Sequence, residues 1–293
     1  MSSAVSIDSA GSPAAHLRLG ARPRAATRSR WWVELLAIGW LLFLYDAVND
    51  LAPLRTSVAL GNARGILHVE QLLHIDPELS LDRWLASHHT LATILANYYD
   101  NAHFVVTLSV LGWLWWRRAD IYRPLRNSLV LVNVIGFVVF WFLPVAPPRM
   151  LDGFTDVVAS THAFGSWHTG ALASAANQFA AMPSLHMAWA GWCTLALWRG
   201  SNRPVVRVLA VAYPCLTAFA VLATGNHFLL DIVGGLAVLA LAVALVDRFG
   251  RLRRRGAPSW AADLPRWRRA RHSPPSLALR MSQSCYEVQD PVD

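Results

Sequence analysis

A succession of long apolar stretches is the feature that most constrains how this chain can fold. A helix needs about 20 mostly apolar residues to cross a bilayer, and six stretches approach or exceed that length, at approximately 31–50, 95–116, 126–145, 183–199, 204–223 and 227–247. Inside hydrocarbon every backbone polar group must bond within the protein, and a helix achieves this within one segment. The sequence therefore predicts an all-α fold, a polytopic membrane helical bundle with six transmembrane helices.

Composition agrees with a membrane protein and argues against a nucleic-acid partner. Hydrophobic residues make up 55% of the chain and charged residues only 15%, which is typical of proteins that span bilayers. The net charge is +8, but all 26 basic residues are arginines, and they gather in the tails and the short connections. Membrane topology explains this pattern better than binding to nucleic acid does.

The arginines also predict an orientation. They are dense before residue 31, from 117 to 126, from 199 to 207 and after 247, whereas the remaining connections hold only Arg55, Arg64, Arg83 and Arg149. Because arginine-rich loops stay on the cytoplasmic side, we expect cytoplasmic termini in the plasma (cytoplasmic) membrane, with loops 51–94, 146–182 and 224–226 on the outer face. The sequence thus predicts three parts of the chain: a disordered cytoplasmic tail (1–30), a six-helix transmembrane domain (31–248) and a cytoplasmic arginine-rich tail (249–293).

The outer loop 51–94 is amphipathic in places. Apolar and charged or polar residues are interleaved in it, at Ile66, Leu67, Glu70, Leu72, Leu73, His74 and Asp76. This pattern favours a segment that lies along the membrane surface. Such a segment is either a lid or a connector.

Two short strings place histidines at the outer ends of predicted spans. They read Pro183-Ser184-Leu185-His186 and His227-Phe228-Leu229-Leu230-Asp231. Ionisable residues are costly in hydrocarbon and usually have a functional reason to be there. On a helix, a spacing of four residues places Asp231 and His227 on one face, so that the carboxylate holds the imidazole. The pair has the features of an activated nucleophile.

Together the two strings resemble the second and third signature motifs of the type 2 phosphatidic acid phosphatase superfamily, which also includes the vanadium haloperoxidases. Leu185 replaces the usual glycine, and Thr224-Gly225-Asn226 precedes the histidine. Both features are similar to the inositol phosphorylceramide synthase-like branch. The resemblance covers about residues 137–235, and the six-span layout extends it to most of the chain.

The resemblance implies a mechanism. His227 would attack phosphorus and form a phosphohistidine, while Asp231 fixes its tautomer and stabilises the charged ring. His186 would protonate the departing alcohol oxygen and then act as base on the acceptor. Ser184 and backbone N–H groups at the start of the fourth span would hold phosphoryl oxygens. No metal and no organic cofactor is needed.

Phosphate binding departs from the superfamily pattern. The third motif usually opens with Ser-Arg, and here those positions hold Ala220 and Val221. The first motif, Lys-x6-Arg-Pro, is absent from the outer loop, but Arg149 lies on the same predicted face as both histidines. We expect Arg149 to bind phosphate in its place, because a guanidinium matches phosphate oxygens bidentately. Arg123-Pro124 resembles the missing motif but falls on the cytoplasmic side and is rejected.

The second span adds candidate substrate ligands. Tyr99, Asp100 and His103 lie near its outer end. Because a charged residue facing lipid is costly, we expect them to face the bundle interior and to bind a headgroup or the acceptor. Asn226, directly before the nucleophile, is a further candidate ligand.

Other features have structural explanations. Gly234-Gly235 in the sixth span predicts close contact between helices. The histidines at 88–89, 162 and 168 match no zinc-binding spacing, so no metal site is predicted.

The sequence thus predicts an integral membrane enzyme that transfers a phosphoryl or phosphoryl-headgroup unit from a membrane lipid phosphate. The branch resemblance favours an inositol-phosphate type phosphotransferase with an alcohol acceptor. The wider superfamily favours a phosphatase that hydrolyses a lipid or polyprenyl phosphate, with water as the acceptor. The missing arginine at Val221 motivates a third hypothesis, a non-catalytic lipid-binding or transport protein.

Overall fold

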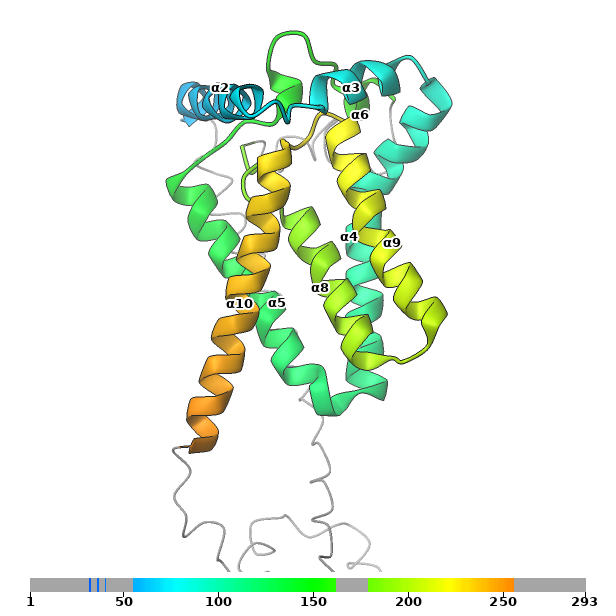
Figure 1. Ribbon diagram of the computed structural model, residues 1–293, viewed down its shortest axis with the longest axis vertical. Coiled ribbons are helices and arrows are strands. Elements are labelled where there is room, and N and C mark those ends of the chain that lie inside the picture. The colour runs from blue at the N-terminus through cyan, green and yellow to red at the C-terminus, as the bar shows by residue number, and fades with distance from the viewer. Residues whose placement is uncertain (1–31, 33–35, 37–39, 41–54, 162–178, 256–293) are drawn as a thin grey trace, which may run out of the picture.

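The computed structural model describes residues 55–161 and 179–255, together with Trp32, Leu36 and Trp40 (Figure 1). Over these residues the predicted all-α fold is confirmed, and the β structure there is limited to one bridge between Val145 and Ala180. The elements in chain order are α2 (Thr56–Leu72), α3 (Glu78–Ala86), α4 (His89–Arg117), α5 (Ala119–Phe142), the 3-10 helix η2 (Pro148–Met150), α6 (Val157–Ser160), α8 (Leu185–Gly200), α9 (Pro204–Ala223) and α10 (Leu229–Arg255).

The long helices α4, α5, α8, α9 and α10 run along the bundle, and α2 and α3 lie across one end of it (Figure 1). Helix α8 packs against the other four. Its Trp192 is fully buried, and the indole N–H donates a hydrogen bond of 2.9 Å to the carbonyl oxygen of Leu125 in α5. The helix that follows the Pro183-Ser184 string is therefore held from several sides.

Glycines set the distance between α8 and α10. A Cβ on Gly191 would come within 2.8 Å of Leu239 Cδ2, and a Cβ on Gly235 would overlap the carbonyl oxygen of Ser184. A Cβ on Gly234 would meet nothing closer than Pro183 Cβ, at 3.5 Å, which is an ordinary contact. The predicted close helix contact is thus confirmed at Gly235.

Three of the described helices are long and apolar enough to cross a membrane: α5, α9 and the Leu229–Leu252 part of α10. Helix α8 has 16 residues, or about 24 Å of helix, which is less than the roughly 30 Å of bilayer hydrocarbon. Helix α4 has 29 residues but carries several polar ones in its first half. The predicted first span, 31–50, lies outside the described residues apart from Trp32, Leu36 and Trp40.

Several helix ends differ from those predicted. Helix α4 begins at His89 rather than 95, and α5 begins at Ala119 rather than 126. Helix α5 ends at Phe142 instead of 145, because Leu143 precedes a proline and such residues avoid the α conformation. Helix α10 begins at Leu229 instead of 227, so His227 lies in the turn before the helix.

The predicted amphipathic loop forms α2 and α3, but its charged and apolar side chains point the opposite way from a soluble surface helix. Glu70 is fully buried, whereas Leu72 and Leu73 are 66% and 58% exposed. A buried carboxylate needs a hydrogen-bond donor, and the donor lies at the start of α10. Outward-facing leucines suit a helix that rests on a lipid surface.

Candidate active site

His227 lies in a tight turn between α9 and α10. Helix α9 ends at Ala223, and Gly225 has a φ of 63°, a left-handed conformation that glycine adopts without strain. The N–H groups of Asn226 and His227 both donate to the carbonyl oxygen of Val221, at 3.1 and 3.2 Å. The turn thereby fixes the backbone of His227, which is 3% exposed.

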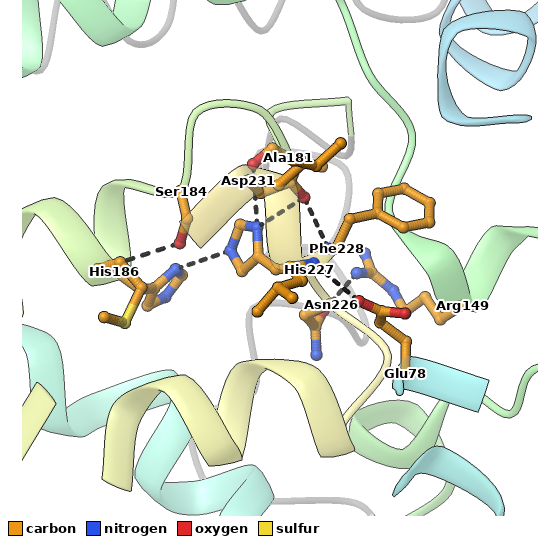
Figure 2. Close-up of polar contacts among 12 residues, drawn as sticks. Glu78, Arg149, Ala181, Ser184, His186, Asn226, His227, Phe228 and Asp231 are labelled. Carbon is orange, nitrogen blue, oxygen red and sulfur yellow. Dashed lines mark hydrogen bonds and ion pairs between the residues drawn. The ribbon is translucent and has the colours of Figure 1, made fainter. Parts of the chain in front are cut away.

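The contacts of the His227 ring define its tautomer. Nδ1 lies 2.9 Å from the carbonyl oxygen of Ala181 and 3.4 Å from Oδ2 of Asp231 (Figure 2). Because a carbonyl oxygen can only accept, Nδ1 carries the proton and donates it. Nε2 therefore keeps its lone pair, which a nucleophilic histidine requires.

The structure brings His227 and Asp231 together, although they do not share a helix face as the spacing predicts. Since α10 starts at Leu229, Asp231 belongs to its first turn. Its Oδ2 turns back and accepts a hydrogen bond of 2.8 Å from the N–H of Phe228. This capping contact carries the carboxylate to the imidazole.

His186 completes a histidine pair. It is the second residue of α8, and its Nδ1 lies 3.2 Å from Nε2 of His227. Because Nε2 of His227 is an acceptor, Nδ1 of His186 is the donor in this contact. The pair therefore brings a ring nitrogen that carries a proton against one that keeps a lone pair.

Contacts at the start of α8 fix the positions of the two histidines relative to each other. The N–H of Ser184 donates to the carbonyl oxygen of Asp231 at 2.9 Å. The Ser184 hydroxyl accepts from the N–H of Met187 at 3.4 Å and so caps α8. The predicted phosphate ligand Ser184 is fully buried and joins α8 to α10.

Two of the predicted residues of the second span contact His186. The ring of Tyr99 stacks on the His186 ring at 4.5 Å between centroids, and the ring of His103 meets it edge-on at 4.4 Å. Nδ1 of His103 donates to the carbonyl oxygen of Tyr99 at 3.0 Å. Asp100, on the same helix, is 1% exposed. Tyr99 and His103 thus hold the ring of His186.

Arg149 binds the turn that carries His227. Its guanidinium donates from Nη1 to Oδ1 of Asn226 (Figure 2), and its Nε lies 3.2 Å from Oδ2 of Asp156. Its backbone N–H donates to the carbonyl oxygen of Gly225 at 2.8 Å. The Arg149 side chain is only 6% exposed. The predicted phosphate-binding cation therefore lies next to the turn that carries His227, with the carboxylate of Asp156 as counter-ion.

The predicted ligand Asn226 orients this arginine. Its Nδ2 donates to the carbonyl oxygen and to the hydroxyl of Thr224, at 3.1 and 2.9 Å. These contacts leave Oδ1 facing the Arg149 guanidinium. Asn226 thus links the turn to the cation.

Some partners in the site were not indicated by the sequence. Ala181 contributes its carbonyl oxygen, which no side-chain pattern reveals. Asp156 lies in a loop without a recognisable motif. Glu70 and Glu78 are fully buried and bind the start of α10. One feature of the sequence could have pointed to them. They are acids interleaved with apolar residues in a predicted membrane-surface segment.

A small cavity borders His186. The space inside it that the centre of a water molecule can occupy is about 10 Å³. This volume has room for about one water molecule. Its lining comes from α4, α8 and α9: Tyr98, Tyr99, His103, His186, Tyr213, Thr217, Ala220 and Val221. Within residues 55–161 and 179–255, no three His, Cys, Asp or Glu side chains gather in a way that could hold a metal ion.

Similarity to known proteins places the chain in a family. Among curated proteins none matches it. The crystal structure of LpxE from Aquifex aeolicus is similar, with a TM-score of 0.45 and 18% sequence identity over 58% of this chain and 94% of LpxE. A family model described as the PAP2 superfamily matches residues 64–245, more than half of the chain and including both histidines. The chain therefore belongs to the PAP2 superfamily, the type 2 phosphatidic acid phosphatases, and is an enzyme of the phosphatase and phosphotransferase class.

Proposed function

We propose that the protein hydrolyses the phosphate of a membrane lipid or polyprenyl phosphate through a phosphohistidine on His227. One observation carries the proposal. Nδ1 of His186 lies 3.2 Å from Nε2 of His227, while Nδ1 of His227 is bound to Ala181 and Asp231. Membership of the PAP2 superfamily supports a membrane lipid phosphate as the substrate.

In the first step Nε2 of His227 bonds to phosphorus while the bond from phosphorus to the lipid oxygen breaks. His186, which starts as the imidazolium cation, gives its Nδ1 proton to that oxygen and becomes neutral, and the lipid leaves as an alcohol. The phosphorylated His227 ring becomes cationic, because its Nδ1 keeps its proton. The carboxylate of Asp231, at 3.4 Å, stabilises this charge.

In the second step neutral His186 takes a proton from water as the water oxygen bonds to phosphorus. The bond from phosphorus to Nε2 of His227 breaks, inorganic phosphate leaves, and both histidines return to their starting states. The cavity beside His186 has room for about one water molecule, although His227 does not line it. Neither step requires a metal or an organic cofactor.

For phosphate binding we propose Arg149, Asn226 and Ser184. Arg149 is anchored to the nucleophile turn and would exchange its contact with Asp156 for phosphate oxygens. Asn226 would orient the guanidinium. Ser184, with N–H groups at the start of α8, would approach the phosphoryl group from the His186 side, where a helix N-terminus favours anions. Tyr99, Asp100 and His103 would line the path of the leaving group or acceptor.

Transfer to an alcohol is the second candidate function. Leu185 and the Thr224-Gly225-Asn226 string favour it, because they are similar to the inositol phosphorylceramide synthase-like branch. The chemistry differs in the second step, where a hydroxyl of an inositol-type or other polyol group replaces water. If the transferred unit carries a headgroup and the acceptor hydroxyl belongs to a lipid alcohol, the product is a new phosphodiester lipid.

We also propose a six-span topology for residues 31–248, with the tails 1–30 and 249–293 on the cytoplasmic side of the plasma membrane. The arginine-rich connections between α4 and α5 and between α8 and α9 lie at the end of the bundle opposite α2 and α3 (Figure 1). The starts of α8 and α10, with the site, lie toward α2 and α3. This arrangement supports an active site at the outer face.

Product analysis tests the proposal and separates its two forms. Purified protein in detergent would receive labelled lipid phosphate, polyprenyl phosphate or phosphoinositide, with and without alcohol acceptors. Hydrolysis releases free phosphate with or without the alcohol. Transfer yields a phosphate ester of the added alcohol: a monoester from a lipid or polyprenyl phosphate, and a diester from a phosphoinositide.

A trapping experiment tests the intermediate. With an aryl phosphate, whose leaving group needs no proton, His186→Ala should accumulate acid-labile phosphate on His227 because water is no longer activated. His227→Ala should accumulate none and turn over no substrate. Turnover by His227→Ala would show that the proposed mechanism is wrong.

A further inference from the structure

Two buried glutamates from α2 and α3 bind the start of α10. Oε1 of Glu78, in α3, accepts a hydrogen bond of 2.8 Å from the N–H of Leu229, and Glu78 is seen beside the turn in Figure 2. Oε1 of Glu70, in α2, accepts one of 2.6 Å from the N–H of Leu230. Both glutamates are 0% exposed. The two helices that lie across the bundle thus reach the segment directly after His227.

Together with Asp231, the glutamates occupy the whole first turn of α10. The N–H of Phe228 donates to Oδ2 of Asp231 at 2.8 Å. Residues 228, 229 and 230 therefore each donate to a carboxylate, and the three carboxylates come from three different helices. These are N–H groups that a helix leaves without partners of its own. The turn between His227 and α10 is held by α2, α3 and α10 together.

A hydroxyl or amide side chain would meet the same hydrogen-bonding need and stay uncharged at every pH, whereas a buried glutamate becomes a costly buried charge once it ionises. Helix α2 is also attached to the bundle without Glu70. Asn62 Nδ2 donates to the carbonyl oxygen of Pro144 at 2.8 Å, and the N–H of Ala146 donates to the carbonyl oxygen of Ala59 at 3.1 Å. Attachment of α2 alone does not explain a buried glutamate at position 70.

The charge of this group depends on pH. Burial is the main cause that raises the pKa of Glu70 to about 8; the hydrogen bond from Leu230 opposes it, and the negative charges of Glu78, Asp231 and Asp76 add to it. Burial also raises the pKa of Glu78. Glu70 is therefore protonated near neutral pH, and its ionisation at higher pH places another negative charge near Asp231.

We propose that Glu70 and Glu78 are positioning residues for the nucleophile: they fix the 227–231 turn from α2 and α3 and so hold the His227 ring in line with His186. The inference rests on the proposed role of His227. Neither glutamate touches the reacting atoms, so each acts through the backbone of the turn.

The sign of the pH effect follows from the two states of Glu70. The folded chain binds this proton more tightly than an unfolded chain does, where the pKa has its ordinary value of 4.5. The stabilisation is complete below about 4.5 and is lost as the pH rises through about 8. In the wild-type enzyme kcat should therefore decline above about pH 8.

Steady-state kinetics of full-length variants across this pH range test the proposal. Glu70→Ala and Glu78→Ala should each lower kcat by about 10-fold or more and leave KM nearly unchanged, because a misplaced nucleophile slows chemistry rather than binding. Glu70→Gln keeps an oxygen for the Leu230 N–H but has no proton to lose. It should recover part of the kcat that Glu70→Ala loses. Its decline in kcat above about pH 8 should be smaller than that of the wild type, because only the loss of the His186 proton then contributes.

Two matched controls separate positioning from attachment of α2. Gln71→Ala changes the exposed neighbour of Glu70 and should leave kcat unchanged. Asn62→Ala loosens α2 without touching α10 and should lower thermal stability more than kcat. The inference is overturned if the alanine variants keep wild-type kcat, if Asn62→Ala loses kcat equally, or if the alkaline decline of Glu70→Gln is as large as that of the wild type. If the alanine variants do not fold, the pH profile of Glu70→Gln decides. Turnover by His227→Ala would instead overturn the proposed function.

Discussion

The backbone N–H of Ser184 donates a hydrogen bond of 2.9 Å to the carbonyl oxygen of Asp231, so the two signature strings are joined directly through the main chain. One turn along α10, Gly235 has no side chain, and the carbonyl oxygen of Ser184 occupies the space that a Cβ would need. The separation of His186 and His227 therefore depends on a contact between two backbones.

Gly235→Ala should separate α8 from α10. Because the obstructing atom is a backbone carbonyl, the overlap cannot be relieved by a side-chain rotation, and we expect a loss of about 1–3 kcal/mol of stability. A shift of about 1 Å between the histidines would lower kcat by up to about 100-fold. Thermal unfolding and turnover of the purified variant measure the two effects.

Gly234→Ala is the matched control, since a Cβ there meets Pro183 Cβ at 3.5 Å without overlap. It should keep both stability and turnover, because alanine is also the better helix former. Equal losses in both variants would contradict the role assigned to Gly235.

The histidine pair could be predicted because its signals are local in sequence. His186 and His227 each stand beside an apolar stretch, and imidazoles at such positions are rare enough to suggest a site. The long helices could be predicted for the same reason, from the length of their apolar stretches. The starts of α8 and α10 each fall two residues later than predicted, because Ser184 and Asp231 act as caps through the N–H groups of Met187 and Phe228 and the apolar stretches do not show where a cap falls.

Contacts made through the backbone, or between residues far apart in the sequence, could not be predicted from the sequence. The carbonyl oxygen of Ala181 fixes the tautomer of His227, yet any residue type supplies such an oxygen. Asp156 binds Arg149, and Glu70 binds Leu230, only because the fold brings distant segments together. Amphipathicity suggested that the segment of Glu70 lies on the membrane surface, but not that its carboxylate turns inward.

Asp231→Asn should lower kcat by about 100-fold, or about 2.7 kcal/mol. The amide oxygen can take the place of Oδ2 and keep the contacts with Phe228 and His227, so the main loss is the charge that stabilises the cationic ring. The carbonyl oxygen of Ala181 still fixes the tautomer. The effect should therefore be smaller than the roughly 10⁴-fold loss seen when such a change also reverses a tautomer.

Asp231→Ala separates the two contributions of this carboxylate. It removes the cap on Phe228 as well as the charge. The free energy of unfolding should therefore fall by about 0.5–2 kcal/mol relative to Asp231→Asn. Thermal unfolding distinguishes it from Asp231→Asn, which keeps the cap. Wild-type kcat in Asp231→Asn would contradict a cationic phosphohistidine.

Arg149→Lys should raise the vanadate concentration needed for half-inhibition by about 10-fold or more, since an ammonium lacks the bidentate geometry of a guanidinium. The Nε contact with Asp156 and the Nη1 contact with Asn226 show that two donors are used in the resting site. Inhibition titrations with vanadate, a mimic of the phosphoryl group in transfer, measure this directly.

Asp156→Asn is the complementary variant. It removes the carboxylate that competes with phosphate for Arg149, so vanadate should bind more tightly than in the wild-type protein. If both variants bind vanadate as the wild type does, Arg149 is not the phosphate ligand.

Tyr99→Leu should lower kcat by about 10-fold, because the stacked ring that holds His186 is lost and the general acid can turn away from His227. Tyr99→Phe keeps the ring and should lose far less. If Tyr99 instead binds the substrate through its hydroxyl, Tyr99→Phe should raise KM as much as Tyr99→Leu does. Comparing kcat and KM of the two variants therefore decides whether this residue positions the acid or recognises the lipid headgroup.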